Sequence, residues 1–209
     1  MAVEMKDGKK ILVTPIATED LTNIHIGDIV YLTGDITTCR DVAHRRVVEE
    51  GKELPVDVRN AAILHAGPII RSLGDEKYEI VSVGPTTSMR MEKFEYEFVE
   101  TTGVRVIVGK GGMKEETERA CKEFGAIFCV FPAGNAVVAA VKVEEIMQAE
   151  WRDLGMPETL WNCKVKEFGP LIVAIDNKGR NYFEEKKVEY NQRKEKIADE
   201  ICRQVGFIK

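Results

Sequence analysis

Short apolar runs rich in β-branched residues alternate along this chain with segments in which apolar residues recur at helical spacing. The first pattern predicts strands and the second predicts amphipathic helices. Their alternation predicts an α/β fold with a parallel central sheet. The predicted strands are residues 11–15, 28–33, 61–66, 78–83, 104–108, 126–131 and 171–175. The predicted helices are residues 40–50, 89–100, 114–124, 136–147 and 188–205, the last with Ile197, Ile201 and Val205 on one face.

Length and charge limit the classes of protein that this chain can be. With 209 residues, 44% of them hydrophobic, we expect one domain over residues 1–209 with a carboxy-terminal helix at 188–205. The 35 acidic and 30 basic residues give a net charge of −5, which disfavours nucleic acid and acidic membranes as partners. No apolar run approaches the roughly 18 residues of a membrane span, and the amino terminus is charged. We therefore expect a soluble, cytoplasmic protein.

The five cysteines are odd in number and widely spaced, and no CxxC motif occurs. This pattern argues against a disulfide framework and against a zinc or iron-sulfur site built by this chain alone. We expect buried, apolar roles for most of them, Cys121 and Cys129 included. Cys39 differs because it stands beside an arginine in a segment with other polar groups. We expect no metal ligands in this chain.

Three predicted strands are each succeeded by a glycine, then by small or hydroxyl residues, and then by a cation. Residues 30–33 lead through Gly34 into TTCRD, residues 80–83 through Gly84 into PTTSMRM, and residues 106–108 through Gly109 into KGGMK. In a parallel sheet such junctions share one edge, where α/β proteins bind ligands. We therefore expect Arg40, Arg90 and Lys110 to lie together.

Two of these cations fall where helices are predicted to begin. Thr38 and Asp41 have the spacing of a capping box, which would put Arg40 in the first helical turn. Arg90 would occupy a first turn if Thr87 or Ser88 were the cap. A cation there costs about 0.3–1 kcal/mol against the helix dipole, whereas a bound carboxylate or phosphate would be favoured by the dipole and the guanidinium together. The pattern favours a shared anion site.

Structural roles are open for the same residues. Either arginine alone could pair with a neighbouring acid, and Thr86, Thr87 and Ser88 could serve only as turn and cap residues. Asp41 and Arg45 are spaced to form an i,i+4 pair that supports a helix. His44 and His65 could act in catalysis or orient a nearby carboxylate. The segment VGKGGMK lacks the GxxxxGK[ST] pattern, which excludes a P-loop triphosphatase.

The motifs TTCRDVAHRR, LHAGP, VGPTTSMRM and VGKGGM, in that order and spacing, resemble the beta subunit of the iron-sulfur dependent class I fumarate hydratases and the related L-tartrate dehydratases. The same domain is the carboxy-terminal part of the single-chain enzymes. The likeness continues through FPAGNAVVAA, DLGMPETLW and IVAIDNKGRNYF, so it spans nearly the whole chain. It implies a swivelling β/β/α domain with a central parallel sheet and a second, mostly antiparallel sheet.

The resemblance also implies an activity and a partner. This chain would be half of a hydro-lyase of the tricarboxylic acid cycle that hydrates fumarate reversibly to (S)-malate. A cluster-binding alpha subunit would hold a [4Fe-4S] cluster, in a hetero-oligomer, with a homodimer as the alternative for the isolated chain. The alternatives are the beta subunit of L-tartrate dehydratase and, in another class, a noncatalytic anion-binding regulatory module.

Residue roles come from the same resemblance. Arg40, Arg90 and Lys110 would bind the small dicarboxylate, and Thr86 would be the catalytic base. Supporting roles fall to Asp41, His44, Thr87 and Ser88, and the last three are alternatives for the base. The family commonly has glycine at positions 39 and 89, where this chain has cysteine and methionine, and both positions border the site.

Overall fold

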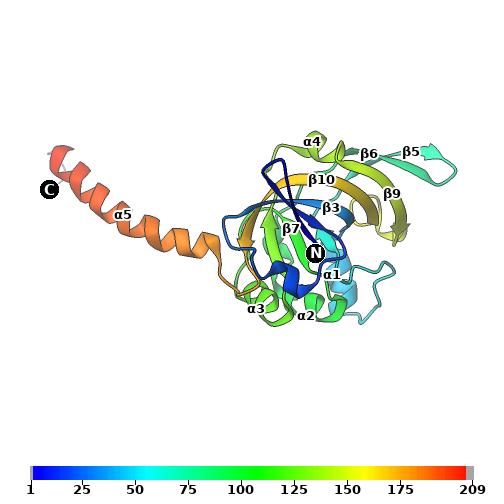
Figure 1. The fold of residues 1–209 in the computed structure, drawn as a ribbon, viewed down its shortest axis with the longest axis horizontal. Coiled ribbons are helices and arrows are strands. Elements are labelled where there is room, and N and C mark those ends of the chain that lie inside the picture. The colour runs from blue at the N-terminus through cyan, green and yellow to red at the C-terminus, as the bar shows by residue number, and fades with distance from the viewer. Residues whose placement is uncertain (1, 206–209) are drawn as a thin grey trace.

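The structure is a computed structural model that describes residues 2–205 of the chain. A mixed sheet, with helices against one face, forms the body (Figure 1). One helix extends from the body as a separate arm. Among the described residues, no helix combines the length and the apolar character that crossing a membrane requires.

Five neighbouring strands of the main sheet run parallel, and antiparallel strands complete it. The long strand β10 pairs with β8, with β9 and also with β3, so that β3, β4, β7, β8 and β10 form a closed ring. The sheet order is β1 (Val3–Lys6), β2 (Lys9–Val13), β3 (Ile29–Thr38), β4 (Ala62–Leu64), β7 (Val106–Gly109), β8 (Ile127–Val130), β10 (Leu160–Ile175) and β9 (Val143–Glu150).

A two-stranded antiparallel sheet, β5 (Ile69–Gly74) with β6 (Lys77–Ser82), projects beside the main sheet. The expected fold class, a central parallel sheet with a second antiparallel sheet, is confirmed. The placement of the strand predicted at 78–83 was wrong, because β6 belongs to this hairpin and not to the parallel sheet. Its short connection to β5 leaves it nearest in space to its neighbour in sequence.

Side chains of the parallel strands alternate between two apolar cores. Leu64 and Val108 point into the core enclosed by the ring, whereas Ile63 and Ile107 belong to a second core with residues of α1–α3. The helices on this second face are α1 (Asp41–Val48), α2 (Glu92–Thr102) and α3 (Glu115–Phe124). Short 3-10 turns occur at η1 (Thr18–Leu21), η2 (Ser88–Arg90) and η3 (Arg152–Leu154).

The helix predicted at 136–147 was wrong over its second half. The chain is helical only in α4 (Ala136–Ala140) and then forms β9, which pairs antiparallel with β10. Pairing with β10, together with packing of the half-buried Ile146 on the core, overrides the helix preference of the Glu-rich segment. Strands β1 and β5 were not predicted either.

The carboxy-terminal helix was predicted at 188–205, and α5 (Tyr182–Val205) confirms it with an earlier start. None of its described residues is buried, and it forms the arm in Figure 1. Ile197 and Ile201 are about half exposed.

Candidate active site

The ends of β3, β4 and β7 bring polar residues to one edge of the parallel sheet, because these strands run in the same direction and pair in register. Arg40 follows β3, His65 follows β4 and Lys110 follows β7. The loop after β6 is not part of this sheet, yet it returns to the same edge. Its Thr86 N–H donates to the His65 carbonyl at 2.6 Å, and Thr87 forms an isolated parallel bridge with Lys110. The three junctions therefore lie at one edge, as predicted. The junction after β6 differs in that it reaches this edge from the hairpin and not from a strand of the parallel sheet.

Arg40 lies at the amino-terminal cap position of α1 and not in its first turn. The predicted capping box is wrong because Thr38 belongs to β3, where its hydroxyl donates to the Thr159 carbonyl and accepts from the Trp161 N–H. The Arg40 guanidinium forms an ion pair with Glu158, whose Oε1 lies 3.1 Å from Nε. It also packs against Gly67, where any side chain would collide with it.

Arg90 lies in η2, with Thr87 at the cap position, and no side chain caps this turn. Its Nη2 donates to the Thr86 hydroxyl at 3.0 Å and lies 3.1 Å from Asp41 Oδ1. The same Asp41 oxygen is 3.9 Å from Arg40 Nε. Asp41 was predicted to pair with Arg45, but it stands between the two guanidinium groups of the site.

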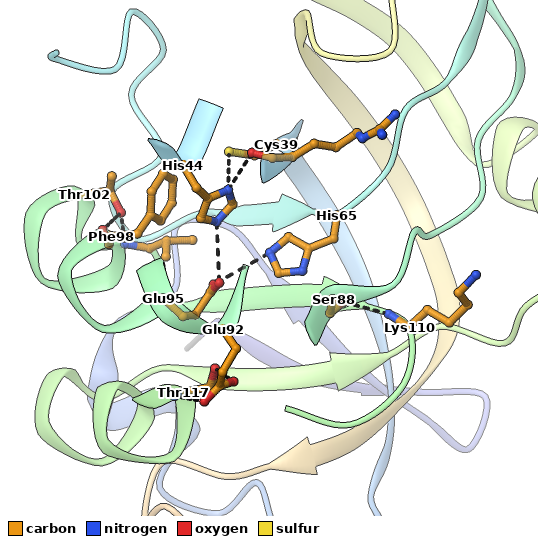
Figure 2. Close-up of polar contacts among 12 residues, drawn as sticks. Cys39, His44, His65, Ser88, Glu92, Glu95, Phe98, Thr102, Lys110 and Thr117 are labelled. Atoms are coloured by element: carbon orange, nitrogen blue, oxygen red, sulfur yellow. Dashed lines mark hydrogen bonds and ion pairs between the residues drawn. The ribbon is translucent and has the colours of Figure 1, made fainter. Parts of the chain in front are cut away.

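Ser88, one of the two residues predicted as a possible helix cap, is not at the cap position. Its side chain is fully buried, and its hydroxyl accepts the Lys110 N–H at 2.9 Å (Figure 2). This bond fixes the backbone at the end of β7. The Lys110 side chain is half-buried, and no carboxylate of residues 2–205 lies within 4.0 Å of its ammonium group.

The structure thus brings Arg40, Thr86 and Arg90 together, with Lys110 tied to the same loop. Two guanidinium groups pair here with two carboxylates, Asp41 and Glu158, and Lys110, which has no acidic partner among residues 2–205, adds a positive charge to the same loop region. Arg40 and Arg90 do pair with neighbouring acids, which was the alternative to an anion site. Each ion pair uses only one nitrogen of the guanidinium, which has five N–H donors, so further donors remain on each arginine. The position of Asp41 shows that one carboxylate can lie within reach of both arginines. The arrangement can therefore bind a carboxylate at an open edge of the domain.

Beneath this edge lies a cluster of three buried polar side chains that was not predicted from the sequence. His44 from α1, His65 after β4 and Glu95 from α2 are all completely buried. His44 Nε2 lies 3.5 Å from Glu95 Oε2, and His65 Nε2 lies 3.7 Å from Glu95 Oε1 (Figure 2). The ring of Phe98 stacks on His44 at 4.1 Å between centroids. A signal for Glu95 existed, since it stands on the apolar face of its helix between Phe94 and Phe98.

The pKa values in this group move in different directions. Burial alone would raise the pKa of Glu95, but the two histidines lower it to about 2. Burial would lower the pKa of His44, yet the neighbouring Cys39 and Glu95 raise it well above 6.5. For His65 burial dominates, and its pKa falls below 6.5. The Glu95 carboxylate, with its low pKa, is ionised and supports the raised pKa of His44.

The cysteines lie apart from the cation cluster, except for Cys39. Cys121, Cys129 and Cys163 are buried, and burial raises the pKa of each thiol, to about 12 for Cys163. The prediction of buried apolar roles for Cys121 and Cys129 is confirmed. Among the described residues, the one set of donors close enough to hold a metal ion is His44, His65 and Glu95, which includes no cysteine.

Comparison with known proteins places these features in a family. The family described as Fumarase C-terminus matches residues 2–186. The L(+)-tartrate dehydratase subunit beta of Escherichia coli is 57% identical over 201 residues, which cover 96% of this chain and 100% of that protein. A putative L(+)-tartrate dehydratase subunit beta of Methanocaldococcus jannaschii is 42% identical over 174 residues, covering 81% of this chain and 89% of that protein.

A more distant relative is a putative class I fumarate hydratase of Geobacillus stearothermophilus, 32% identical over 174 residues. These cover 83% of this chain but 33% of that longer protein. The match over most of the chain agrees with the motifs that meet at the cation cluster. This chain belongs to the Fumarase C-terminus family.

Proposed function

We propose that this chain is the beta subunit of a hydro-lyase that dehydrates L(+)-tartrate to oxaloacetate, together with a separate alpha subunit. Support comes from the relative named L(+)-tartrate dehydratase subunit beta, which matches along its full length at 57% identity. The relative named as a fumarate hydratase reaches 32%. Fumarate, which the sequence put first, is therefore favoured less than tartrate. Both substrates are small dicarboxylates and would use the same cations.

The observation that carries the proposal is the contact of Arg90 with both Thr86 and the carboxylate of Asp41. Dehydration requires removal of a proton from the carbon beside a carboxylate and departure of hydroxide from the next carbon. Arg40, Arg90 and Lys110 would hold the substrate carboxylates and stabilise the negative charge that develops. Thr86 would accept the proton, and the Arg90 N–H on its oxygen favours the alkoxide form. The product enol then becomes oxaloacetate by moving a proton to carbon.

Two acidic side chains already contact the cations, and they would respond differently to the substrate. Asp41 occupies the place of a carboxylate between the arginines, and its side chain is about one third exposed. We propose that a substrate carboxylate takes over part of its contact with Arg90. Glu158 is more enclosed, and burial raises its pKa despite the adjacent Arg40. It would stay with Arg40 and fix the direction of that guanidinium.

The [4Fe-4S] cluster implied by the family resemblance does not fit the cysteines of this chain. The thiols of Cys121, Cys129 and Cys163 are buried with raised pKa values, whereas cluster ligands are thiolates. We therefore propose that the alpha subunit holds the cluster, where an open iron would act as a Lewis acid on the departing hydroxyl. All five cysteines are free thiols, and we propose the reducing cytoplasm as the location.

Anaerobic co-expression with an alpha subunit tests the proposal. The purified pair should form oxaloacetate from L(+)-tartrate, with a larger kcat/KM than for hydration of fumarate. A pair that prefers fumarate would be a fumarate hydratase. A chain that binds dicarboxylates, forms no pair and supports no turnover would be the noncatalytic anion-binding module. Mixing the separately purified subunits is the control that activity needs both.

A further inference from the structure

The two buried histidines contact the main chain of two residues of the site, Arg40 and Thr86. His44 Nδ1 lies 2.8 Å from the Arg40 carbonyl, which also accepts the His44 backbone N–H at 3.0 Å. The His65 carbonyl accepts the Thr86 N–H at 2.6 Å. Glu95 lies between the two rings and contacts both (Figure 2). One carboxylate is thus linked to the main chain on both sides of the site.

Counting protons shows which charges this group carries. The Arg40 carbonyl can only accept a hydrogen bond, so His44 Nδ1 must carry a proton. The other nitrogen, Nε2, lies 3.5 Å from the Glu95 carboxylate and would carry a proton as the cation of an ion pair. We infer that His44 is an imidazolium paired with Glu95. His65 Nε2 lies 3.7 Å from Glu95, and because burial lowers the pKa of this ring we assign it as neutral. The directions in which burial and neighbouring charges move the three pKa values agree with this assignment.

A bound metal ion is the competing explanation for two histidines and a glutamate in contact. A metal requires its donors to point at one centre, with bonds of about 2.0–2.2 Å. Here the histidines face different oxygens of Glu95, Oε2 for His44 and Oε1 for His65. Each oxygen of Glu95 thus faces one ring nitrogen, as in an ion pair, at 3.5 and 3.7 Å. The three donor atoms also lie within 4.8 Å of one another, so the metal content of the purified chain decides between the two explanations. The stacked ring of Phe98 further encloses His44.

We propose that His44, Glu95 and His65 are positioning residues that hold the main chain of Arg40 and of Thr86 in the geometry that catalysis needs. The inference rests on the proposed function, because it assigns these residues to the same site. Neither histidine nor the glutamate touches the substrate. Their effect passes through the Arg40 carbonyl and the Thr86 N–H. Partners that orient metal ligands contribute about 10–100-fold to activity, and we expect an effect of the same order here.

The first measurement uses the isolated full-length chain and needs no activity. In ¹⁵N-histidine NMR spectra at pH 8, His44 should show two protonated ring nitrogens and His65 one. Glu95→Gln keeps the shape of the side chain but removes its charge, and His44 should then lose its second proton. A neutral His44 in the wild-type chain would overturn the proposal. So would one equivalent of zinc in the purified chain that a His65→Gln variant fails to retain.

The second measurement uses the complex with the alpha subunit. Turnover of L(+)-tartrate by Glu95→Gln should fall about 10–100-fold, mainly in kcat, when assayed at a temperature at which the variant is fully folded. Glu97→Gln, an exposed change on the same helix, should match the wild type. His65→Gln, which retains an N–H donor, should keep more activity than His65→Leu. Wild-type turnover by Glu95→Gln would contradict the positioning role.

These measurements separate the two proposals. If the wild-type complex fails to dehydrate tartrate while the NMR spectra show the imidazolium, the proposed function fails and the charge assignment stands. If tartrate turnover is present and Glu95→Gln preserves it, the function stands and the positioning role fails.

Discussion

The Arg90 guanidinium donates to the Thr86 hydroxyl, with 3.0 Å between Nη2 and Oγ1. The two residues are four apart in sequence, one on the loop after β6 and one in η2. A hydroxyl that receives a cationic donor is easier to deprotonate, because the donor stabilises the alkoxide. Each pKa unit of that change corresponds to about 1.36 kcal/mol. The contact gives a physical basis for assigning a weakly acidic alcohol as the base.

Thr86→Ala should therefore lower kcat for tartrate by about 10²–10⁴-fold, the usual contribution of a general base. Binding should persist, because Arg40, Arg90 and Lys110 remain. Steady-state kinetics and the affinity for an unreactive dicarboxylate would check the two effects separately. Thr87→Ala, at the exposed neighbouring position, should remain active. If Thr87→Ala is the inactive variant, the base is Thr87.

Arg90→Met should act mainly on binding. Charge-assisted hydrogen bonds contribute about 1.5–3 kcal/mol, so KM for tartrate should rise about 10–100-fold. The same change removes the donor on Thr86, and kcat should fall as well. Arg45→Met, at an exposed position of α1, is the matched control and should leave both constants unchanged. An unaltered KM in Arg90→Met would exclude the assigned contact.

The sequence predicted much of this site because short-range patterns determine it. The order of strands and polar junctions along the chain placed Arg40 and Lys110 at one edge, although β3 continues through Gly34 to Thr38, beyond its predicted end at residue 33. Long-range pairing could not be predicted in the same way. Thr38 has the spacing of a helix cap, but its hydroxyl bonds with β10, more than 120 residues away. Glu158 reaches the site through tertiary contacts that no local pattern encodes, and the helical pattern marks Glu95 as inward-facing without showing which residues it meets.

The same reason explains the errors in secondary structure. Residues 143–150 follow a helix and have no strict alternation, and only the neighbouring β10 makes them a strand. Strand β6 resembles the parallel strands in composition, yet its hairpin partner β5 was not recognised. Periodicity describes how residues are spaced along the chain. It does not describe which strand lies next to which.

Gly109→Ala should disturb the site by crowding. A Cβ at Gly109 would collide with the buried Ser88 hydroxyl and lie 3.0 Å from Phe128. Because that hydroxyl accepts the Lys110 N–H, its displacement should move Lys110. Overpacking of this kind costs about 1–3 kcal/mol, measurable by urea unfolding. Gly112→Ala is the control, since the nearest atom to its Cβ would be 3.6 Å away.

Glu92→Ala should lower stability without acting on the charged site. The Glu92 carboxylate, at the start of α2, accepts N–H groups of Lys114, Glu116 and Thr117 at the start of α3 and also the Thr117 hydroxyl. It serves as the amino-terminal cap of a helix distant in sequence. Loss of a cap costs about 0.5–2 kcal/mol. Thermal unfolding should show the decrease, and Glu97→Ala, exposed on the same helix, should show none.

The two buried histidines should change the unfolding free energy in opposite directions with pH. His44 acts above its ordinary pKa of 6.5 and His65 acts below it. The pKa of His44 is raised in the folded chain. Its contribution is therefore complete below pH 6.5 and is lost as the pH rises through the folded-state value. The pKa of His65 is lowered, so its contribution is complete above pH 6.5 and is lost as the pH falls. Glu95 adds a further loss below its ordinary value of 4.5, toward pH 2.

Urea unfolding from pH 5 to pH 9 would resolve these effects by subtraction. The stability difference between wild type and His44→Gln should shrink as the pH rises above 6.5, because only the wild type loses a favourable charge. The difference between wild type and His65→Gln should shrink in the opposite direction, as the pH falls below 6.5. His25→Gln, the same substitution at an exposed position, is the control. If the stability difference from wild type varies with pH in the same way for all three variants, then His44 is not charged and His65 not neutral as assigned.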